Sequence, residues 1–229
     1  TYTEAAKTEI DGVPCHIFPA QSAFVGGDIT AGIYACGMHE TEDLTLLIDL
    51  GTNGEMVLGN RERMIACATA AGPAFEGGAN RGVWGADMVS ILARLLRDSV
   101  IDETGLLADA YFDSGVRVAD VCVTQGAIRA IQLAKAAIAA GIRILMREYG
   151  IGADANGFER IRRVVLAGGF GYYLDPADAA YIGLLPRELA ERTIAGGNTA
   201  LRGCLRAGRE VLSARETESE REKFGAGSV

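Results

Sequence analysis

The sequence predicts an α/β fold in which a mixed β-sheet is flanked by helices. Three apolar runs, at residues 44–50, 55–58 and 64–71, follow one another across short turns, as the strands of a meander do. The stretch 124–149 then repeats apolar side chains at helical spacing. A short buried run at 161–167 leads directly into glycines. Strands before and after one long helix indicate the α/β class.

The bulk composition is that of an ordinary globular protein. The chain has 229 residues, enough for one large domain or two small lobes, and 49% of them are hydrophobic. Because no apolar segment approaches a membrane span and the N-terminus lacks a signal-peptide pattern, we expect a cytoplasmic protein with no membrane partner. The net charge of −8 and the scattered arginines argue against a nucleic-acid partner.

The cysteines and histidines show no metal or nucleophile pattern. The five cysteines form no C-x-x-C pair, and we expect reduced, mostly buried thiols. The two histidines are isolated and have no Ser or Cys neighbour in a nucleophile motif, which argues against histidine-based catalysis. These residues are Cys15, Cys36, Cys67, Cys122, Cys204, His16 and His39.

The first expected elements are a strand, a helix and a second strand that ends in a glycine-rich turn. Residues 13–18 are expected to form a strand, and Gly26-Gly27-Asp28 leads into a helix that ends near Met38. The strand at 44–50 carries Asp49 next to its end, and Gly51-Thr52-Asn53-Gly54 follows it. Asn53-Gly54 predicts a type I′ hairpin turn, because both central residues of that turn need positive φ.

The next expected elements are a glycine-rich loop and two helices. A glycine-rich loop is expected at 72–82 and a helix at 88–97. In the long helix, Thr124 is the expected N-cap and Gly150 the stop. Lys135 lies at the edge of the apolar stripe, where we favour an ammonium group that reaches solvent over a catalytic one.

The C-terminal part is expected to hold two more helices, one from Pro176 and one from Thr199 through Leu212. Residues 213–229 are charged, then small and polar. We expect them to form a solvated helix that frays into a disordered end.

Three glycine-rich turns, at 49–54, 168–171 and 196–199, each follow an apolar strand. Close packing of a helix on a strand can explain one such turn, and we favour that explanation for the last one. Three of them in one small chain indicate backbone kept bare for a flat, anionic ligand such as a nucleotide. Neither a Walker A nor a Rossmann pattern occurs.

The first two turns can be assigned to parts of such a ligand. The turn after Asp49 would hold phosphates on backbone N–H groups, with the carboxylate on a metal-bound water. The alternative is a tight turn with a solvated aspartate. Gly168-Gly169 would let the base or ribose lie on the chain, and a helix N-terminus after Gly171 would add partial positive charge.

Five segments extend this pattern to a family resemblance. They are 24–28 (FVGGD), 47–55 (LIDLGTNGE), 68–78 (ATAAGPAFEGG), 123–125 with 131–138 (VTQ, IQLAKAAI) and 166–171 (LAGGFG). The strand-and-turn order is similar to that of the acetate kinase, sugar kinase, Hsp70 and actin superfamily. Together the segments resemble the C-terminal domain of the ATP-dependent reductive activators of corrinoid proteins.

The resemblance implies an actin-like ATPase (ribonuclease H-like) domain, with residues 1–229 as the C-terminal part of a larger multidomain protein. It implies ATP and Mg²⁺ as cofactors, a corrinoid protein as partner, and a homodimer. It also implies a [2Fe–2S] cluster in a ferredoxin domain that this chain lacks, whose electron returns Co(II) corrinoid to Co(I). The implied residues are Asp49 for catalysis and for Mg²⁺ through water; Gly27, Asp28, Gly51, Thr52, Asn53 and Gly54 for phosphate; and Gly168, Gly169, Phe170 and Gly171 for adenosine.

This sequence departs from the family in three places. Ala127 stands where the family commonly has an acidic or basic residue, and Tyr172 stands where it commonly has Asn. Relatives also carry an extra stretch between the positions of Gly82 and Ala86. Two other functions stay open: a small-molecule phosphotransferase related to acetate or sugar kinases, and a non-catalytic domain that docks a corrinoid protein.

Overall fold

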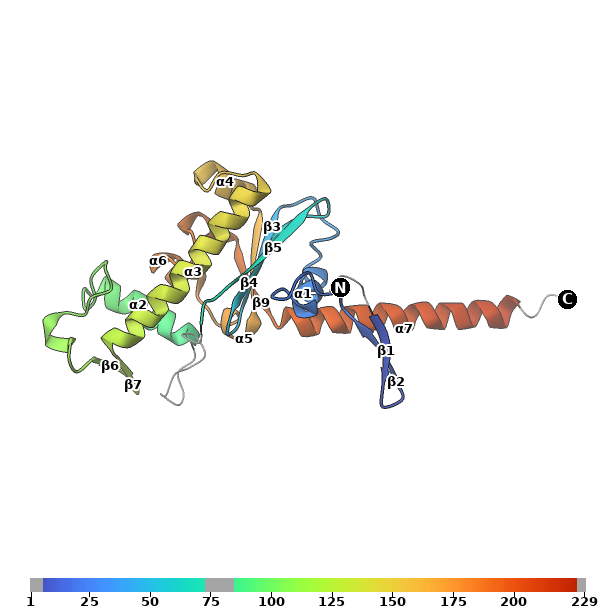
Figure 1. Ribbon diagram of the computed structural model, residues 1–229, viewed down its shortest axis with the longest axis horizontal. Coiled ribbons are helices and arrows are strands. Elements are labelled where there is room, and N and C mark those ends of the chain that lie inside the picture. Colours follow the sequence, from blue (N-terminus) through green and yellow to red (C-terminus); the bar gives the residue numbers. More distant parts are fainter. Residues whose placement is uncertain (1–5, 73–84, 226–229) are drawn as a thin grey trace.

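The computed structural model describes residues 6–72 and 85–225, with strands and helices in one chain order (Figure 1). Most of the glycine-rich loop expected at 72–82, and the junction between Gly82 and Ala86, lie outside these residues. The elements are β1 (Ala6–Ile10), β2 (Val13–Ile17), α1 (Gly27–Ala35), β3 (Thr45–Leu50), β4 (Gly54–Gly59), β5 (Met64–Thr69), α2 (Gly85–Arg97), η2 (Asp109–Tyr111), β6 (Val116–Val118), β7 (Val121–Val123), α3 (Gln125–Tyr149), α4 (Ala155–Arg160), β8 (Arg163–Ala167), α5 (Gly168–Gly171), α6 (Pro176–Tyr181), η3 (Arg187–Arg192), β9 (Thr193–Gly197) and α7 (Thr199–Gly225).

The central sheet has five strands in the order β5-β4-β3-β8-β9. The strands β3, β4 and β5 form the expected antiparallel meander, whereas β8 and β9 run parallel to β3. The predicted mixed sheet is therefore confirmed. Two separate hairpins, β1–β2 and β6–β7, lie outside it.

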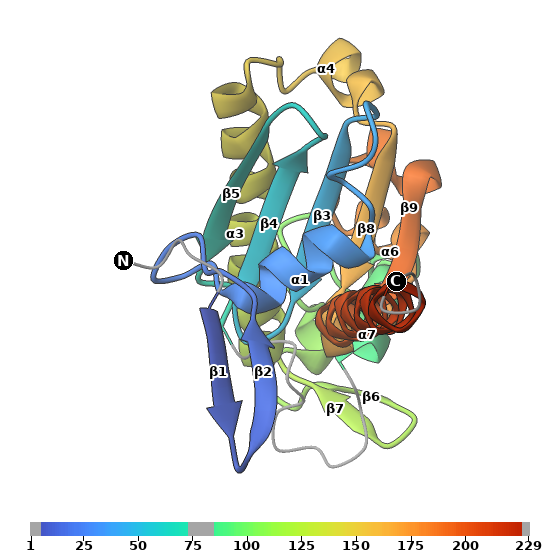
Figure 2. The ribbon, with the colours of Figure 1, turned by 90° about the vertical axis from the view of Figure 1, so that its right-hand side faces the viewer.

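Helices cover both faces of this sheet (Figure 2). On one face, Leu46 and Ile48 of β3 belong to the same buried cluster as Ile138 and Ile142 of α3. On the other face, Leu47 packs in a second cluster with Ile29 of α1. Because successive side chains of a strand point to opposite faces, β3 has to be apolar almost throughout. This explains the uninterrupted apolar run that predicted it.

The long helix α3 begins and ends at the predicted residues. The Thr124 hydroxyl accepts a hydrogen bond from the Ala127 N–H at 3.3 Å, and Gly150 adopts a left-handed φ of 90°. Lys135 differs from the expectation, because its ammonium group donates to the Ile182 carbonyl instead of extending into water. Burial lowers the pKa of this lysine.

The predicted type I′ turn at Asn53-Gly54 is wrong. Gly54 already belongs to β4, where it pairs with Leu50, so the connection is a three-residue loop. Neither Asn53 nor Gly54 has positive φ. Glycine is needed at position 54 for another reason, since a Cβ there would lie 2.8 Å from Thr69 Oγ1.

Two other expectations are corrected. The helical turn expected after Gly171 is α5, which starts at Gly168 and contains only four residues. The thiols are not buried: four cysteines are half-buried and Cys204 is exposed, and all five are free. Cys15 lies in the exposed β1–β2 hairpin and Cys67 in the edge strand β5, so neither position is enclosed on both faces.

The last helix, α7, crosses α1 and continues to Gly225, well beyond the predicted Leu212 (Figure 1). The prediction that 213–229 begins as a helix is thus confirmed as far as residue 225. Among the described residues, no helix is both long and apolar enough to cross a membrane.

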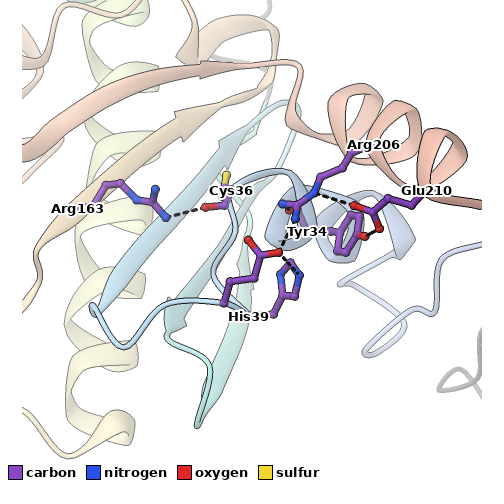
Figure 3. Close-up of polar contacts among 7 residues, drawn as sticks. Tyr34, Cys36, His39, Arg163, Arg206 and Glu210 are labelled. Atoms are coloured by element: carbon purple, nitrogen blue, oxygen red, sulfur yellow. Dashed lines mark hydrogen bonds and ion pairs between the residues drawn. The ribbon is translucent and has the colours of Figure 1, made fainter. Parts of the chain in front are cut away.

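A polar network joins α7 to α1 and to the loop after it (Figure 3). The Arg206 guanidinium donates to the Tyr34 carbonyl at 2.9 Å, lies 4.6 Å from the centre of the Tyr34 ring, and pairs with Glu40 and Glu210. The Tyr34 hydroxyl donates to Glu210. Because these groups are largely solvated, we assign the network to orientation of the helices more than to stability.

The two helices approach each other closely at Gly203. A Cβ on this residue would lie 2.0 Å from the Ala31 carbonyl oxygen. We expect Gly203→Ala to lower the free energy of unfolding by about 2 kcal/mol, because a backbone atom cannot move aside as a flexible side chain can. Gly208, on the same helix, has open space around the position that a Cβ would take, with no neighbour within 4 Å. Gly208→Ala should therefore raise stability by up to about 1 kcal/mol through helix propensity. Urea unfolding of the two variants compares them directly, and equal effects would show that the α1–α7 contact is not tight.

Candidate functional site

The candidate site lies where the chain leaves β3 and β8, two adjacent parallel strands. After β3 the chain turns toward β4 on one side, and after β8 it leads on to β9 on the other. In open α/β sheets, ligands bind in the crevice at such a reversal of strand order, outside the carboxyl ends of the strands. The third glycine turn follows β9, so all three predicted turns lie at the same end of the sheet (Figure 1).

Asp49 and Gly168 are brought into direct contact at this point. Asp49 pairs with Ala167 in the parallel ladder. A Cβ on Gly168 would lie 2.6 Å from Asp49 Oδ1 and 2.4 Å from the Leu50 carbonyl oxygen, and Gly168 has a left-handed φ of 85°. Only glycine fits both the space and the backbone conformation.

Three carboxylates gather around this contact. Asp49 and Glu55 are half-buried partners in the β3–β4 ladder, and Asp28 lies at the start of α1. Burial, with the charges of Glu55 and Asp28, raises the pKa of Asp49 to about 6. Burial also raises the pKa of Glu55. None of the described Lys or Arg side chains forms an ion pair with these acids.

The raised pKa of Asp49 predicts a pH-dependent stability. Between about pH 4 and pH 6 the folded chain holds a proton that the unfolded chain has released, so folding stability falls as the pH rises. Asp49→Asn removes this penalty. The variant should be about 2 kcal/mol more stable than the wild type at pH 7 and equally stable at pH 4.

Urea unfolding at both pH values measures this difference. Asp43→Asn, which changes an exposed carboxylate just before β3, is the matched control. The same stability gain at both pH values would contradict the assignment.

The loop between β3 and β4 is only partly as expected. Gly51, Thr52 and Asn53 are exposed. No described atom lies closer than 4.0 Å to a Cβ on Gly51, so the backbone is open on that side. The Gly51 N–H, however, donates to the Asn53 carbonyl at 3.0 Å and is engaged within the loop.

The predicted residues of α1 have different surroundings. Gly27 lies against the backbone of Phe18, where a Cβ would be 2.6 Å from the carbonyl oxygen, so packing alone requires this glycine. Asp28 is exposed, and its Oδ1 accepts from the Ile29 N–H at 2.9 Å. Asp28 therefore acts on the site only through its negative charge, which helps to raise the pKa of Asp49.

The turn after β8 presents mainly one bare residue. Gly169 is exposed and has no neighbour within 4 Å of a Cβ position, so a ligand can approach its backbone. Phe170 is 9% exposed and belongs to the core, which leaves only its backbone for contact with a ligand. Gly171 packs on Leu166.

The turn after β9 has the structural explanation that we favoured. A Cβ on Gly196 would lie 2.6 Å from Val165 Cγ1. Sequence reasoning placed an apolar strand before this turn without giving its bounds. The strand is β9, whose residues Ile194 and Ala195 are exposed and show no buried alternation.

The carboxylates fit a hydrated cation better than a directly bound one. Within the part of the chain that the structure describes, no three Asp, Glu, His or Cys side chains could together hold a metal ion. Hard cations such as Mg²⁺ keep several waters and use one or two carboxylates beside a phosphate. Asp49 and Glu55 match that requirement. Sequence reasoning had not named Glu55 as a site residue. Its position opposite Asp49 in the predicted hairpin could have indicated that the two carboxylates lie side by side.

Comparisons with known proteins agree with this geometry. A family model described as the C-terminal domain of RACo, the ASKHA domain, matches residues 43–81 and 78–224. A corrinoid activation enzyme, RamQ of Eubacterium limosum, is 31% identical over 226 aligned positions, which cover 74% of this chain and 37% of that protein. A solved structure of a reductive activator for corrinoid, iron-sulfur protein is 30% identical with a TM-score of 0.73, over 91% of this chain and 40% of that one.

The chain thus spans about two fifths of the length of these two proteins. The predicted resemblance and the actin-like fold class are both confirmed. The chain belongs to the family of the C-terminal ASKHA domain of RACo.

Proposed function

We propose that this chain is the ATP-binding domain of a reductive activator that returns the Co(II) corrinoid of a partner protein to Co(I). The contact of the Asp49 carboxylate with the bare Gly168 turn, at the switch point of an ASKHA domain, is the observation that carries the proposal. The names of the two relatives supply the corrinoid partner and the reductive chemistry.

The charge of the site supports a magnesium nucleotide over a bare one. Asp28, Asp49 and Glu55 together would repel a triphosphate, and the described residues bring no ion-paired Lys or Arg to offset them. Mg²⁺ would supply the positive charge and polarise the phosphate. Asp49 would accept hydrogen bonds from the metal's water, and the exposed Gly169 backbone would lie against the adenosine.

The remainder of the activity is assigned to parts of the protein outside this chain. The electron would come from a [2Fe–2S] cluster in a ferredoxin domain, and a second lobe would close over the nucleotide. Closure of the two lobes would change how the corrinoid is held, which couples ATP to reduction. A cytoplasmic location and a homodimer complete the proposal.

Isothermal titration of the full-length protein with ATP and Mg²⁺ tests the nucleotide site. We expect saturable binding that is lost when Mg²⁺ is omitted. The corrinoid step is tested by the Co(I) absorption of an added cobalamin-binding protein, which should appear only with ATP and an electron donor. Absence of ATP binding would overturn the proposal at its first step.

No observation favours the phosphotransferase alternative. A kinase needs an acceptor pocket next to the phosphate. A cavity of about 860 Å³ among the described residues, beside α3, does not supply it, because it is lined by residues such as Lys135, Arg143 and Arg187 and by none of the site residues. The docking alternative predicts capture of a cobalamin-binding protein that is independent of ATP and unchanged in Asp49→Asn. We expect instead that capture of the cobalamin-binding protein changes with ATP and that it changes in Asp49→Asn.

A further inference from the structure

Two neighbouring tyrosines follow the Gly168 turn and are exposed. Tyr172 is 52% exposed and Tyr173 is 68% exposed, whereas Phe170 in the same turn is 9% exposed. An exposed aromatic ring next to a ligand site offers a flat face on which a base can stack. Phe170, which the family resemblance assigns to adenosine, is thus buried, whereas Tyr172, two positions later, is exposed.

Tyr172 is tied to the candidate site by its backbone. Its N–H donates to the Gly168 carbonyl at 3.3 Å, so it lies one helical turn after the residue that contacts Asp49. Any ligand that lies against the exposed Gly169 backbone therefore has the Tyr172 side chain as a near neighbour.

The ring of Tyr172 lies beside a glycine and a second ring. A Cβ on Gly197 would lie 3.4 Å from Tyr172 Cδ2 and 3.7 Å from Cε2, so the ring borders the space that this glycine leaves free. The Tyr173 ring meets the Tyr172 ring edge-on, at 4.8 Å between centres and 87° between planes. Gly197 is the last residue of β9, so Tyr172 spans the carboxyl ends of β8 and β9.

We propose that Tyr172 is the platform on which the base of the bound nucleotide stacks; this inference rests on the proposed nucleotide-binding function. The phosphate turn follows β3, and the ring lies over the ends of the two strands beyond it. Two strand spacings amount to about 10 Å, a distance that a nucleotide extended along this edge covers. Stacking on an aromatic ring requires only the flat face of a base, so the contact selects for a base without demanding one particular hydrogen-bond pattern.

The test compares a ligand that has a base with one that lacks it. ATP and inorganic tripolyphosphate, each with Mg²⁺, are titrated calorimetrically into the full-length wild type and three variants. Tyr172→Ala should weaken ATP binding about 10-fold to 100-fold and leave tripolyphosphate binding unchanged. Tyr172→Phe keeps the ring and should bind ATP within about 3-fold of the wild type. Tyr173→Ala removes the edge-on neighbour but keeps the Tyr172 ring, and it should weaken ATP binding by less than about 3-fold.

A second measurement detects the stacking contact directly. Nuclear Overhauser contacts between tyrosine ring protons and the adenine H2 and H8 protons should appear in the wild type and in Tyr173→Ala, and disappear in Tyr172→Ala. Equal ATP affinity in wild type and Tyr172→Ala would overturn the inference and leave the proposed function standing. Parallel loss of ATP and tripolyphosphate binding would also overturn it, because the ring would then act only on the turn. A wild type that binds no ATP would overturn the proposed function itself.

Discussion

Replacement of Asp49 by asparagine is expected to lower ATP hydrolysis by the full-length protein at least about 100-fold. Asparagine has nearly the same shape, but it cannot carry the negative charge that would hold and orient the water bound to Mg²⁺. The substitution also removes a carboxylate whose pKa is raised to about 6 by burial and by its acidic neighbours. Folding should therefore not suffer, and a loss of activity would report on chemistry alone.

Phosphate release at saturating ATP and Mg²⁺ measures this loss. Asp43→Asn, which lies just before the other end of β3, is the matched control and should keep wild-type turnover. If Asp49→Asn retains turnover within a few-fold, Asp49 has no part in the mechanism.

Gly168→Ala is expected to destabilise the protein by about 3 kcal/mol or more. The left-handed φ of 85° costs about 1–2 kcal/mol for any residue with a Cβ. The added methyl would also lie 2.4 Å from the Leu50 carbonyl oxygen, which is backbone of the central strand and cannot rotate away. Relief of the overlap requires β3 and β8 to separate where they form the site. Nucleotide binding should be lost together with stability.

Gly169→Ala is the matched control for this prediction. Its φ is not positive and no described atom lies within 4 Å of a Cβ position. Stability should change by less than about 0.5 kcal/mol. Thermal unfolding should place the Gly168→Ala midpoint about 6–12 °C below that of Gly169→Ala. Equal midpoints would mean that the contact between Asp49 and Gly168 is looser than the structure describes.

Much of the fold could be predicted, because its central elements carry strong local signals. The strand β3 is apolar on both faces, and α3 has a threonine cap and a left-handed glycine at its ends. The strand expected at 13–18 is confirmed as β2, whereas its partner β1 was not predicted and β9 was predicted without bounds, since their residues are exposed or nearly so. Periodic burial leaves no pattern in elements that are not buried.

The site was predictable in its parts and less so in its arrangement. Asp49 lies next to the end of β3 and Gly168 follows β8, two apolar runs that the sequence identifies, and their contact needs only the parallel pairing of these strands. The roles of single glycines could not be read from the sequence. Gly27 and Gly196 fit against the backbone of Phe18 and the side chain of Val165, whereas Gly169 is open to a ligand. Composition is the same at all three positions, and only packing distinguishes them.

The parallel pairing of β3 with β8 also has a kinetic consequence. Between these strands the chain forms two further sheet strands, a hairpin and the long helix, so the pairing closes a very large loop. Such long-range contacts form late, after local structure has offset part of the entropic cost of loop closure. A partly folded chain would possess α3 and the meander without a place for a nucleotide. Nucleotide would then bind only the completed fold, and its free energy of unfolding would rise with nucleotide concentration.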